Sequence, residues 1–168
     1  VDPFAAITEL RAYIDAEGID YHGEAPAEET IDFWRDLILS HRVEPRLDAD
    51  RPTFVYDYPA TQASLARVRS GEPPVAERFE LYWRGLELAN GFHELCDAQE
   101  QARRFAVDRE QRVRLGLASV PEDQRLLEAL QSGLPPCAGV AIGVDRLLMA
   151  LTGVTHIHEV LAFPIDRA

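Results

Sequence analysis

The stretch that most constrains the fold is residues 77–97, where apolar and polar residues alternate and Arg84-Gly85 interrupts the pattern. A period of two combined with many aromatic residues predicts two antiparallel strands joined by a tight turn. A two-residue turn at Arg84-Gly85 would place Tyr82 opposite Glu87, with Glu80 on the same face. Carboxylates so close repel each other unless a cation lies between them. The hairpin therefore presents an acidic face that is either solvated or built to bind a positive group.

A second candidate for the turn is Asn90-Gly91, because this pair favours two-residue hairpin loops. That turn would oppose Glu87 directly with Glu94, and like charges in this arrangement are unfavourable. We therefore predict the Arg84-Gly85 turn with a long second strand. A β-bulge near Ala89 would bring three more side chains to the face of Glu87: Asn90, Phe92 and Glu94. Such a surface suits an ammonium group, and a solvated sheet face is the alternative.

A second candidate site begins at the apolar run 139–143, which predicts a short buried strand. One face of this strand carries only Gly139, Ala141 and Gly143, so a flat ligand could lie against the backbone. Close packing of a helix on that face is the alternative. Arg146 falls in the first turn of the next helix, where a cation opposes the helix macrodipole. Its guanidinium beside free N–H groups suits a polyphosphate, and an ion pair with a nearby acid is the alternative.

Local patterns predict the other elements. Asp2-Pro3 resembles an N-cap followed by a first-turn proline. Asp97 and Glu100 resemble a capping box, and so do Ser119 and Glu122. The expected helices cover about 3–17, 27–41, 98–115, 120–132 and 144–151, the other strands cover 53–58 and 161–164, and a helical turn covers 156–160. The fold class is therefore α+β, an antiparallel sheet flanked by helices.

Composition limits the class of function. The 168 residues suffice for one domain with its own core. A formal net charge of −12 repels nucleic-acid backbones, which argues against tRNA or DNA as the main partner. No apolar run is long enough to span a bilayer, and residues 1–3 do not begin a signal peptide. The spacing of Cys96 and Cys137 indicates neither a metal site nor a disulfide framework, which favours a cytoplasmic location.

Several of these motifs resemble a known family. Residues 139–146 resemble motif 3 of the class II aminoacyl-tRNA synthetases, and residues 79–94 resemble the lysine-recognising hairpin of the lysyl members. Residues 58–66 and 161–168 are similar to the paralogue of the lysyl enzymes that attaches (R)-β-lysine to elongation factor P. Ala141 also follows the paralogue, since the lysyl enzymes have glycine there.

The resemblance implies roles for individual residues. Glu80 and Glu87 would hold Mg²⁺ and help to bind ATP, with the backbone of Leu81 near the adenine. Gly143 and Arg146 would also bind ATP, and Arg146 would act in catalysis by reaching the terminal phosphates. The amino-acid substrate would be received by five residues: Glu87, Asn90, Phe92, Glu94 and Ala141.

The resemblance also implies a reaction. ATP would activate (R)-β-lysine, or lysine, as an acyl-adenylate, and a lysine amine of elongation factor P would then displace AMP. No protein nucleophile is needed, so catalysis would rest on positioning and on neutralisation of charge. The parent enzyme is expected to be a homodimer.

The chain departs from the family pattern because motifs 1 and 2 are absent. Residues 1–52 fit a helical connecting segment, and residues 53–168 carry the substrate hairpin and motif 3. We therefore expect the chain to be the C-terminal part of a synthetase-like catalytic domain and to be inactive as a ligase by itself. Two alternatives remain: part of a lysyl-tRNA synthetase, and a non-catalytic module that binds an amino acid or a nucleotide.

Overall fold

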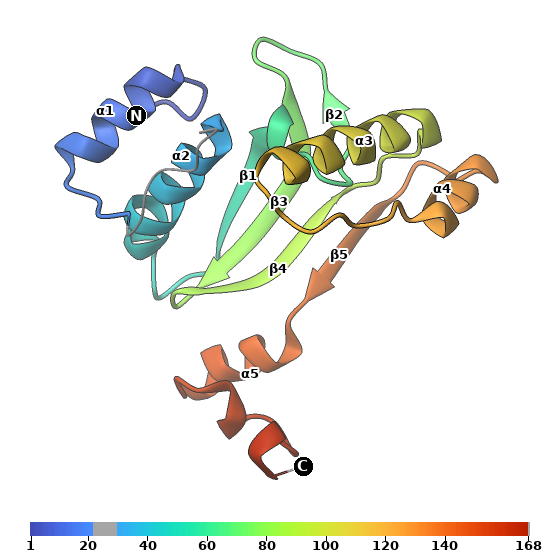
Figure 1. The fold of residues 1–168 in the computed structure, drawn as a ribbon. Helices are drawn as coiled ribbons and strands as arrows, with labels where there is room; N and C mark the ends of the chain where they lie inside the picture. The colour runs from blue at the N-terminus through green and yellow to red at the C-terminus, as the bar shows by residue number, and fades with distance from the viewer. Residues whose placement is uncertain (22–29, 168) are drawn as a thin grey trace.

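A five-stranded antiparallel sheet forms the centre of the protein in a computed structural model that describes residues 1–21 and 30–167 (Figure 1). Its strands lie in the order β1-β3-β4-β5, and the short β2 pairs with β3 on the side away from β1, since Val75 and Ala76 pair with both strands. The strands are β1 (Thr53–Pro59), β2 (Val68–Arg69), β3 (Val75–Trp83), β4 (Leu86–His93) and β5 (Ala138–Ile142). The central hairpin β3-β4 thus places one strand of the pair next to β1 and the other next to β5.

Helices lie around this sheet, which confirms the predicted α+β class. Figure 1 shows α1 and α2 beside β1, α3 and α4 towards the far end of the hairpin, and α5 beyond the turn. The α-helices are α1 (Ile7–Ala16), α2 (Ile31–Ile38), α3 (Ala98–Arg114), α4 (Gln124–Gln131) and α5 (Val144–Thr152). After α2 the chain continues through a π-helical turn (Leu39–Val43) and a 3-10 turn (Glu44–Arg46). Over the described residues, no helix combines the length and the apolar character needed to cross a membrane.

The hairpin has the predicted register. Arg84 and Gly85 both adopt positive φ, 52° and 73°, as a two-residue hairpin loop requires. Tyr82 pairs with Glu87, and the register then shifts so that Leu81 pairs with Ala89. One extra residue, Leu88, therefore forms a β-bulge next to the predicted position. The Asn90-Gly91 alternative is excluded, because both residues lie inside β4.

Two predicted helix starts are wrong. Asp2 accepts a hydrogen bond from the N–H of Phe4 in a separate turn, and α1 begins only after Ala6. The cap of α4 is Asp123, whose carboxylate accepts from the N–H of Leu126 at 3.0 Å, so Ser119 and Glu122 do not form the predicted capping box. A polar side chain caps a helix only where the backbone enters helical geometry, and sequence alone does not fix that position.

Two strand predictions also need correction. Residues 161–164 do not form a strand, because the chain turns there: the N–H of Leu161 bonds to Ile157 O. Strand β5 exists as predicted, but it is largely exposed instead of buried, since it lies at an edge of the sheet. The predicted helix 27–41 is found from Ile31 onward, and its first residues, 27–29, lie outside the described residues.

The N-terminal helices have a core of their own. Five buried apolar side chains pack between α1 and α2: Leu10, Ile14, Ile19, Trp34 and Ile38. Trp34 is fully buried, and its ring meets those of Tyr21 and Phe33 edge-on at centroid distances of 5.3 and 5.0 Å. A second small core lies where β1 and β2 meet β3. The helical segment is therefore held chiefly by its own packing, beside the sheet that carries the candidate site.

Candidate active site

Glu80 is the centre of a buried polar network on the hairpin. Its side chain is held by hydroxyl groups from two strands: the Tyr58 hydroxyl donates to Oε2 at 2.6 Å and the Tyr82 hydroxyl at 2.5 Å. Arg78 forms an ion pair with Oε1, and Asn90 Nδ2 lies 3.5 Å from the same oxygen. Residues 78, 80 and 82 share one face because they alternate along β3, and the bulge turns Asn90 towards them.

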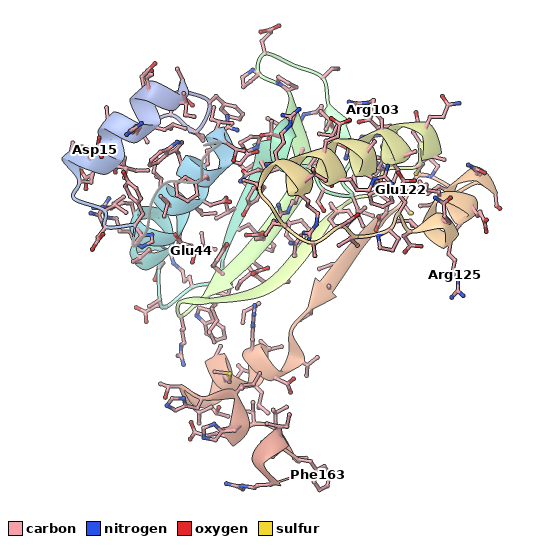
Figure 2. All side chains as sticks on the ribbon, viewed as in Figure 1. Asp15, Glu44, Arg103, Glu122, Arg125 and Phe163 are labelled. Carbon is pink, nitrogen blue, oxygen red and sulfur yellow. The ribbon has the colours of Figure 1, made fainter. Side chains whose placement is uncertain are left out.

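The network also fixes protonation states. Burial, followed by the hydrogen bond to Glu80, raises the pKa of Tyr58 and of Tyr82 well above the usual range of tyrosine. Both phenols therefore stay protonated and act as donors to the carboxylate. Burial and the nearby charge of Glu80 raise the pKa of Glu44, which lies on the 3-10 turn after α2 (Figure 2).

Arg78 is held on three sides. Its guanidinium lies 4.5 Å from the centre of the Tyr58 ring, in cation–π geometry. Nη1 donates to the backbone oxygen of Gln62 at 3.2 Å, while Nη2 contacts Glu80. The arginine is therefore a fixed counter-charge for Glu80.

Arg146 meets the other carboxylate of the hairpin. Its Nη1 donates to the backbone oxygen of Glu87 at 2.9 Å and lies 3.7 Å from Glu87 Oε2. Gly143, the N-cap of α5, places the start of this helix beside β4, because its N–H donates to Leu88 O at 2.8 Å. The guanidinium and the acidic face thus belong to one continuous surface, and the predicted alternative of an ion pair with a nearby acid is also realised.

The remaining predicted substrate residues on β4 lie next to the small residues of β5 in the sheet. Asn90 pairs with Ala141, and Phe92 pairs with Gly139. Glu94 follows at the end of β4, and its Oε1 would lie 2.7 Å from a Cβ at Gly139. Asn90 Oδ1 is buried and has no hydrogen-bond partner among the described residues. A buried acceptor in this state suits a ligand that donates hydrogen bonds.

Leu81 differs from its neighbours because its side chain points to the opposite face of the sheet, where it pairs with Phe54 and Ala89. Only its backbone can belong to the site, and the family resemblance likewise implied a role for the Leu81 backbone alone.

The residues suit a divalent cation unequally. Glu87 has an oxygen whose nearest partner, Arg146, is 3.7 Å away, so it can serve as a metal ligand. Both oxygens of Glu80 are occupied by the contacts to Tyr58, Tyr82 and Arg78, so a metal could bind there only after Arg78 moves. Among residues 1–21 and 30–167, no three acidic, histidine or cysteine side chains cluster as a metal site.

Sequence reasoning missed two residues of this site, Arg78 and Tyr58, and one contact of a third, Gly139. Arg78 was detectable, because it alternates with Glu80 along a predicted strand. Tyr58 was not, because its contact depends on the register between β1 and β3, and a bulge at Asp57 shifts that register. Gly139 was noted only as part of a bare face, and its specific neighbour, Glu94, required coordinates.

The antiparallel sheet, the acidic hairpin and the helix-start arginine define a class II synthetase-like domain. Residues 19–167 match the family described as tRNA synthetases class II (D, K and N), and the chain belongs to this family.

Three similar curated proteins share the name elongation factor P--(R)-beta-lysine ligase. The chain is 49% identical over 168 residues to the protein of Proteus mirabilis (strain HI4320). It is 50% identical over 169 residues to that of Klebsiella pneumoniae (strain 342), and 48% over 169 residues to that of Salmonella gallinarum. The resemblance to the β-lysine paralogue is thus confirmed. Each alignment covers all of this chain and 51% of the relative, so the chain spans about half the length of these relatives.

Alanine substitutions at Gly91 and Gly139 are expected to lower the free energy of unfolding by very different amounts. A Cβ at Gly91 would lie 2.8 Å from the backbone oxygen of Gly139 and 2.7 Å from Phe79 Cζ, so Gly91→Ala should cost about 1–3 kcal/mol of unfolding free energy. A Cβ at Gly139 meets only the flexible end of Glu94, so Gly139→Ala should change stability by less than about 0.5 kcal/mol. Urea unfolding measures both variants, and equal losses would contradict the close contact at Gly91.

Proposed function

We propose that the chain contributes the amino-acid and nucleotide site of an ATP-dependent ligase that attaches (R)-β-lysine, or lysine, to a lysine side chain of elongation factor P. The proposal is carried by the 48–50% identity, over the whole chain, to proteins with that name. Because the chain spans about half of their length, the activity is proposed for a polypeptide that also has a counterpart of the other half. The 168 residues by themselves are proposed to be inactive as a ligase.

The amine end of the substrate is assigned to the hairpin. Ammonium groups would be received by the Glu87 and Glu94 carboxylates and by Asn90, whose buried Oδ1 lacks a partner among the described residues. The ring of Phe92 would pack beside the alkyl chain, and Ala141, opposite Asn90, would form the floor. Positive charge is favoured here because the Glu80 charge is already balanced by Arg78, while Glu87 has only a 3.7 Å contact with Arg146 and Glu94 has no ion pair among the described residues.

The nucleotide is assigned to the adjoining end of the same surface. Both contacts of Arg146 to Glu87 use Nη1, so the rest of the guanidinium can meet the terminal phosphates of ATP. Gly143 would let the nucleotide approach the backbone, and the backbone of Leu81 would lie near the adenine. Glu87 would hold Mg²⁺, and Glu80 would join it only when Arg78 moves aside. Bound Mg²⁺ would neutralise phosphate charge.

The proposed reaction has two steps. A carboxylate oxygen of the amino acid attacks the α-phosphorus of ATP, and the bond to the pyrophosphate oxygen breaks. The neutral amine of a lysine on elongation factor P then attacks the acyl carbon, loses a proton and releases AMP. The residues of this chain would position both reactants and stabilise charge without forming a covalent bond. A cytoplasmic location and a homodimeric parent enzyme belong to the same proposal.

A chimera tests the proposal, in which this chain replaces the matching half of the Proteus mirabilis ligase. We expect ATP- and (R)-β-lysine-dependent modification of elongation factor P, read by intact-protein mass spectrometry, and no pyrophosphate exchange by the 168-residue chain alone. Glu94→Gln should lower kcat/KM for the amino acid by at least about tenfold, since a charged hydrogen bond contributes about 1.5–3 kcal/mol. The exposed Glu128→Gln is the matched control. Acylation of tRNA in preference to elongation factor P would contradict the proposal.

A further inference from the structure

Glu94, which the proposed function assigns to the amine end of the substrate, lies just beyond the last residue of β4. Its backbone is held on both sides. On one side its N–H donates to Cys137 O at 3.0 Å. On the other side it forms a β-bridge with Ala66, which belongs to the loop of residues 60–66 that follows β1. The 60–66 loop therefore adjoins the backbone that carries this carboxylate.

Two backbone hydrogen bonds flank the bridge. The N–H of Arg67 donates to His93 O at 2.8 Å, and the N–H of Leu95 donates to Leu65 O at 3.0 Å. Ala66 itself is fully buried. The position of the 60–66 loop therefore fixes the direction in which the chain leaves β4.

Arg104 on α3 holds this loop in place. Its Nη1 donates to the backbone oxygens of Ser64 and Ala66 at 2.8 and 2.9 Å, and its Nε donates to Glu100 Oε1 at 2.9 Å. Ser64 adopts φ 50°, a left-handed conformation that is unfavourable for a residue with a Cβ. The loop backbone thus needs an external support at this point, and the rigid guanidinium fork supplies it.

Helix α3 brings Arg104 to the loop because it starts directly after the hairpin. Asp97 is its N-cap and accepts from the N–H groups of Gln99 and Glu100 at 2.9 and 3.1 Å. About two helical turns later Arg104 reaches back to the loop. The chain therefore runs from Glu94 through α3 to Arg104, whose guanidinium closes the circuit onto the loop that pairs with Glu94.

We propose that Arg104 is a positioning residue for the amine end of the site. It fixes the 60–66 loop and, through the bridge from Ala66, the place of the Glu94 carboxylate. Arg104 contacts neither the amino acid nor the nucleotide, so it acts through Glu94. The inference rests on the proposed function, because the role of Glu94 in receiving an ammonium group belongs to that proposal.

Amide hydrogen exchange, followed by NMR in the 168-residue chain, tests the positioning without any ligand. Arg104→Met should accelerate exchange of the Arg67 and Leu95 amides by about tenfold or more, because both amides bond across the loop and the end of β4. The Gly143 amide, which bonds near the start of β4, should exchange at an unchanged rate.

Arg103→Met is the matched control. Arg103 precedes Arg104 in α3 and pairs with the same carboxylate, that of Glu100. Its side chain is 67% exposed, and its hydrogen bonds among the described residues all go to Glu100. The two variants therefore remove the same charge, and only one of them removes the support of the loop.

Steady-state kinetics of the chimera test the consequence for the substrate. Arg104→Met should raise KM for the amino acid by about tenfold or more, since misplacing a group by about 1 Å can cost about 100-fold. KM for ATP should change by less than about twofold, because the contacts of Arg146 and Gly143 to β4 do not involve the loop. A variant that only lowered stability would not separate the two KM values.

Arg104→Lys is the second variant, for use if Arg104→Met does not fold. The lysine ammonium keeps the charge beside Glu100 but lacks the fork, so both effects should appear in smaller degree. Unchanged exchange of the Arg67 and Leu95 amides would overturn the inference, and so would equal rises of the two KM values. An inactive chimera together with accelerated exchange would contradict the proposed function and support the positioning of the loop by Arg104.

Discussion

Replacing Arg78 with methionine is expected to destabilise the protein by about 2–4 kcal/mol, because it leaves the Glu80 carboxylate buried without its counter-charge. The two tyrosine hydroxyls can still donate, so the loss should stay at the lower end of the range for broken buried pairs. Urea unfolding followed by far-UV circular dichroism measures the change.

The control for this experiment is Arg51→Met. Arg51 pairs with Asp48 at 2.8 Å, but its side chain is 83% exposed, and such pairs contribute at most about 1 kcal/mol. Adding Glu80→Gln to Arg78→Met should recover part of the loss, since the uncompensated charge disappears. If Arg78→Met costs no more than Arg51→Met, the carboxylate does not need the arginine, and the role given to Arg78 is wrong.

Replacing Trp34 with alanine is expected to cost about 3–5 kcal/mol, the largest loss from any apolar position that we consider. The ring is fully buried between α1 and α2 and contacts Tyr21 and Phe33. The loss should be concentrated in the N-terminal helices, because the core around Trp34 consists of their own residues. Hydrogen exchange of the α1 amides should therefore accelerate more than exchange of the β3 amides.

Two further variants serve as controls, because each should lose much less stability than Trp34→Ala. The indole Nε1 of Trp34 is buried without a partner among the described residues, so Trp34→Phe removes an unsatisfied donor and should cost far less than Trp34→Ala. Phe163 is 82% exposed near the C-terminal end (Figure 2), and Phe163→Ala should change stability by less than about 0.5 kcal/mol. A Trp34→Ala loss as small as that of Phe163→Ala would show that the two helices do not share a core.

The hairpin was predictable because its determinants are local. Alternation indicated the strands, Arg84-Gly85 indicated the turn, and the cost of opposing two carboxylates favoured this register over a turn at Asn90-Gly91. The choice of Arg146 as a candidate site residue also followed from a local signal, a cation at the wrong end of a helix. These features need only neighbouring residues, so the sequence contains enough information to place them.

The errors arose where distant segments decide the outcome. An apolar run such as β5 predicts burial, but whether it is covered depends on what lies beside it in the sheet. Tyr58 reaches Glu80 only because Asp57, at φ 57°, shifts the register of β1. The cap of α4 could have been any of several nearby polar residues, and only the backbone geometry at Asp123 selects one. Long-range pairing and backbone angles of this kind are not encoded in a local pattern.

The single extra residue at Leu88 has a consequence for how this protein can change. On either side of it the strand shows opposite parity, so Asn90 faces the carboxylates while Ala89 faces away. A point substitution alters one side chain, whereas deleting one residue between Glu87 and Asn90 would turn every later side chain of β4 to the other face. Single substitutions can therefore change the side chains of the hairpin one at a time. The number of residues in this strand cannot change by one without moving the later side chains to the wrong face.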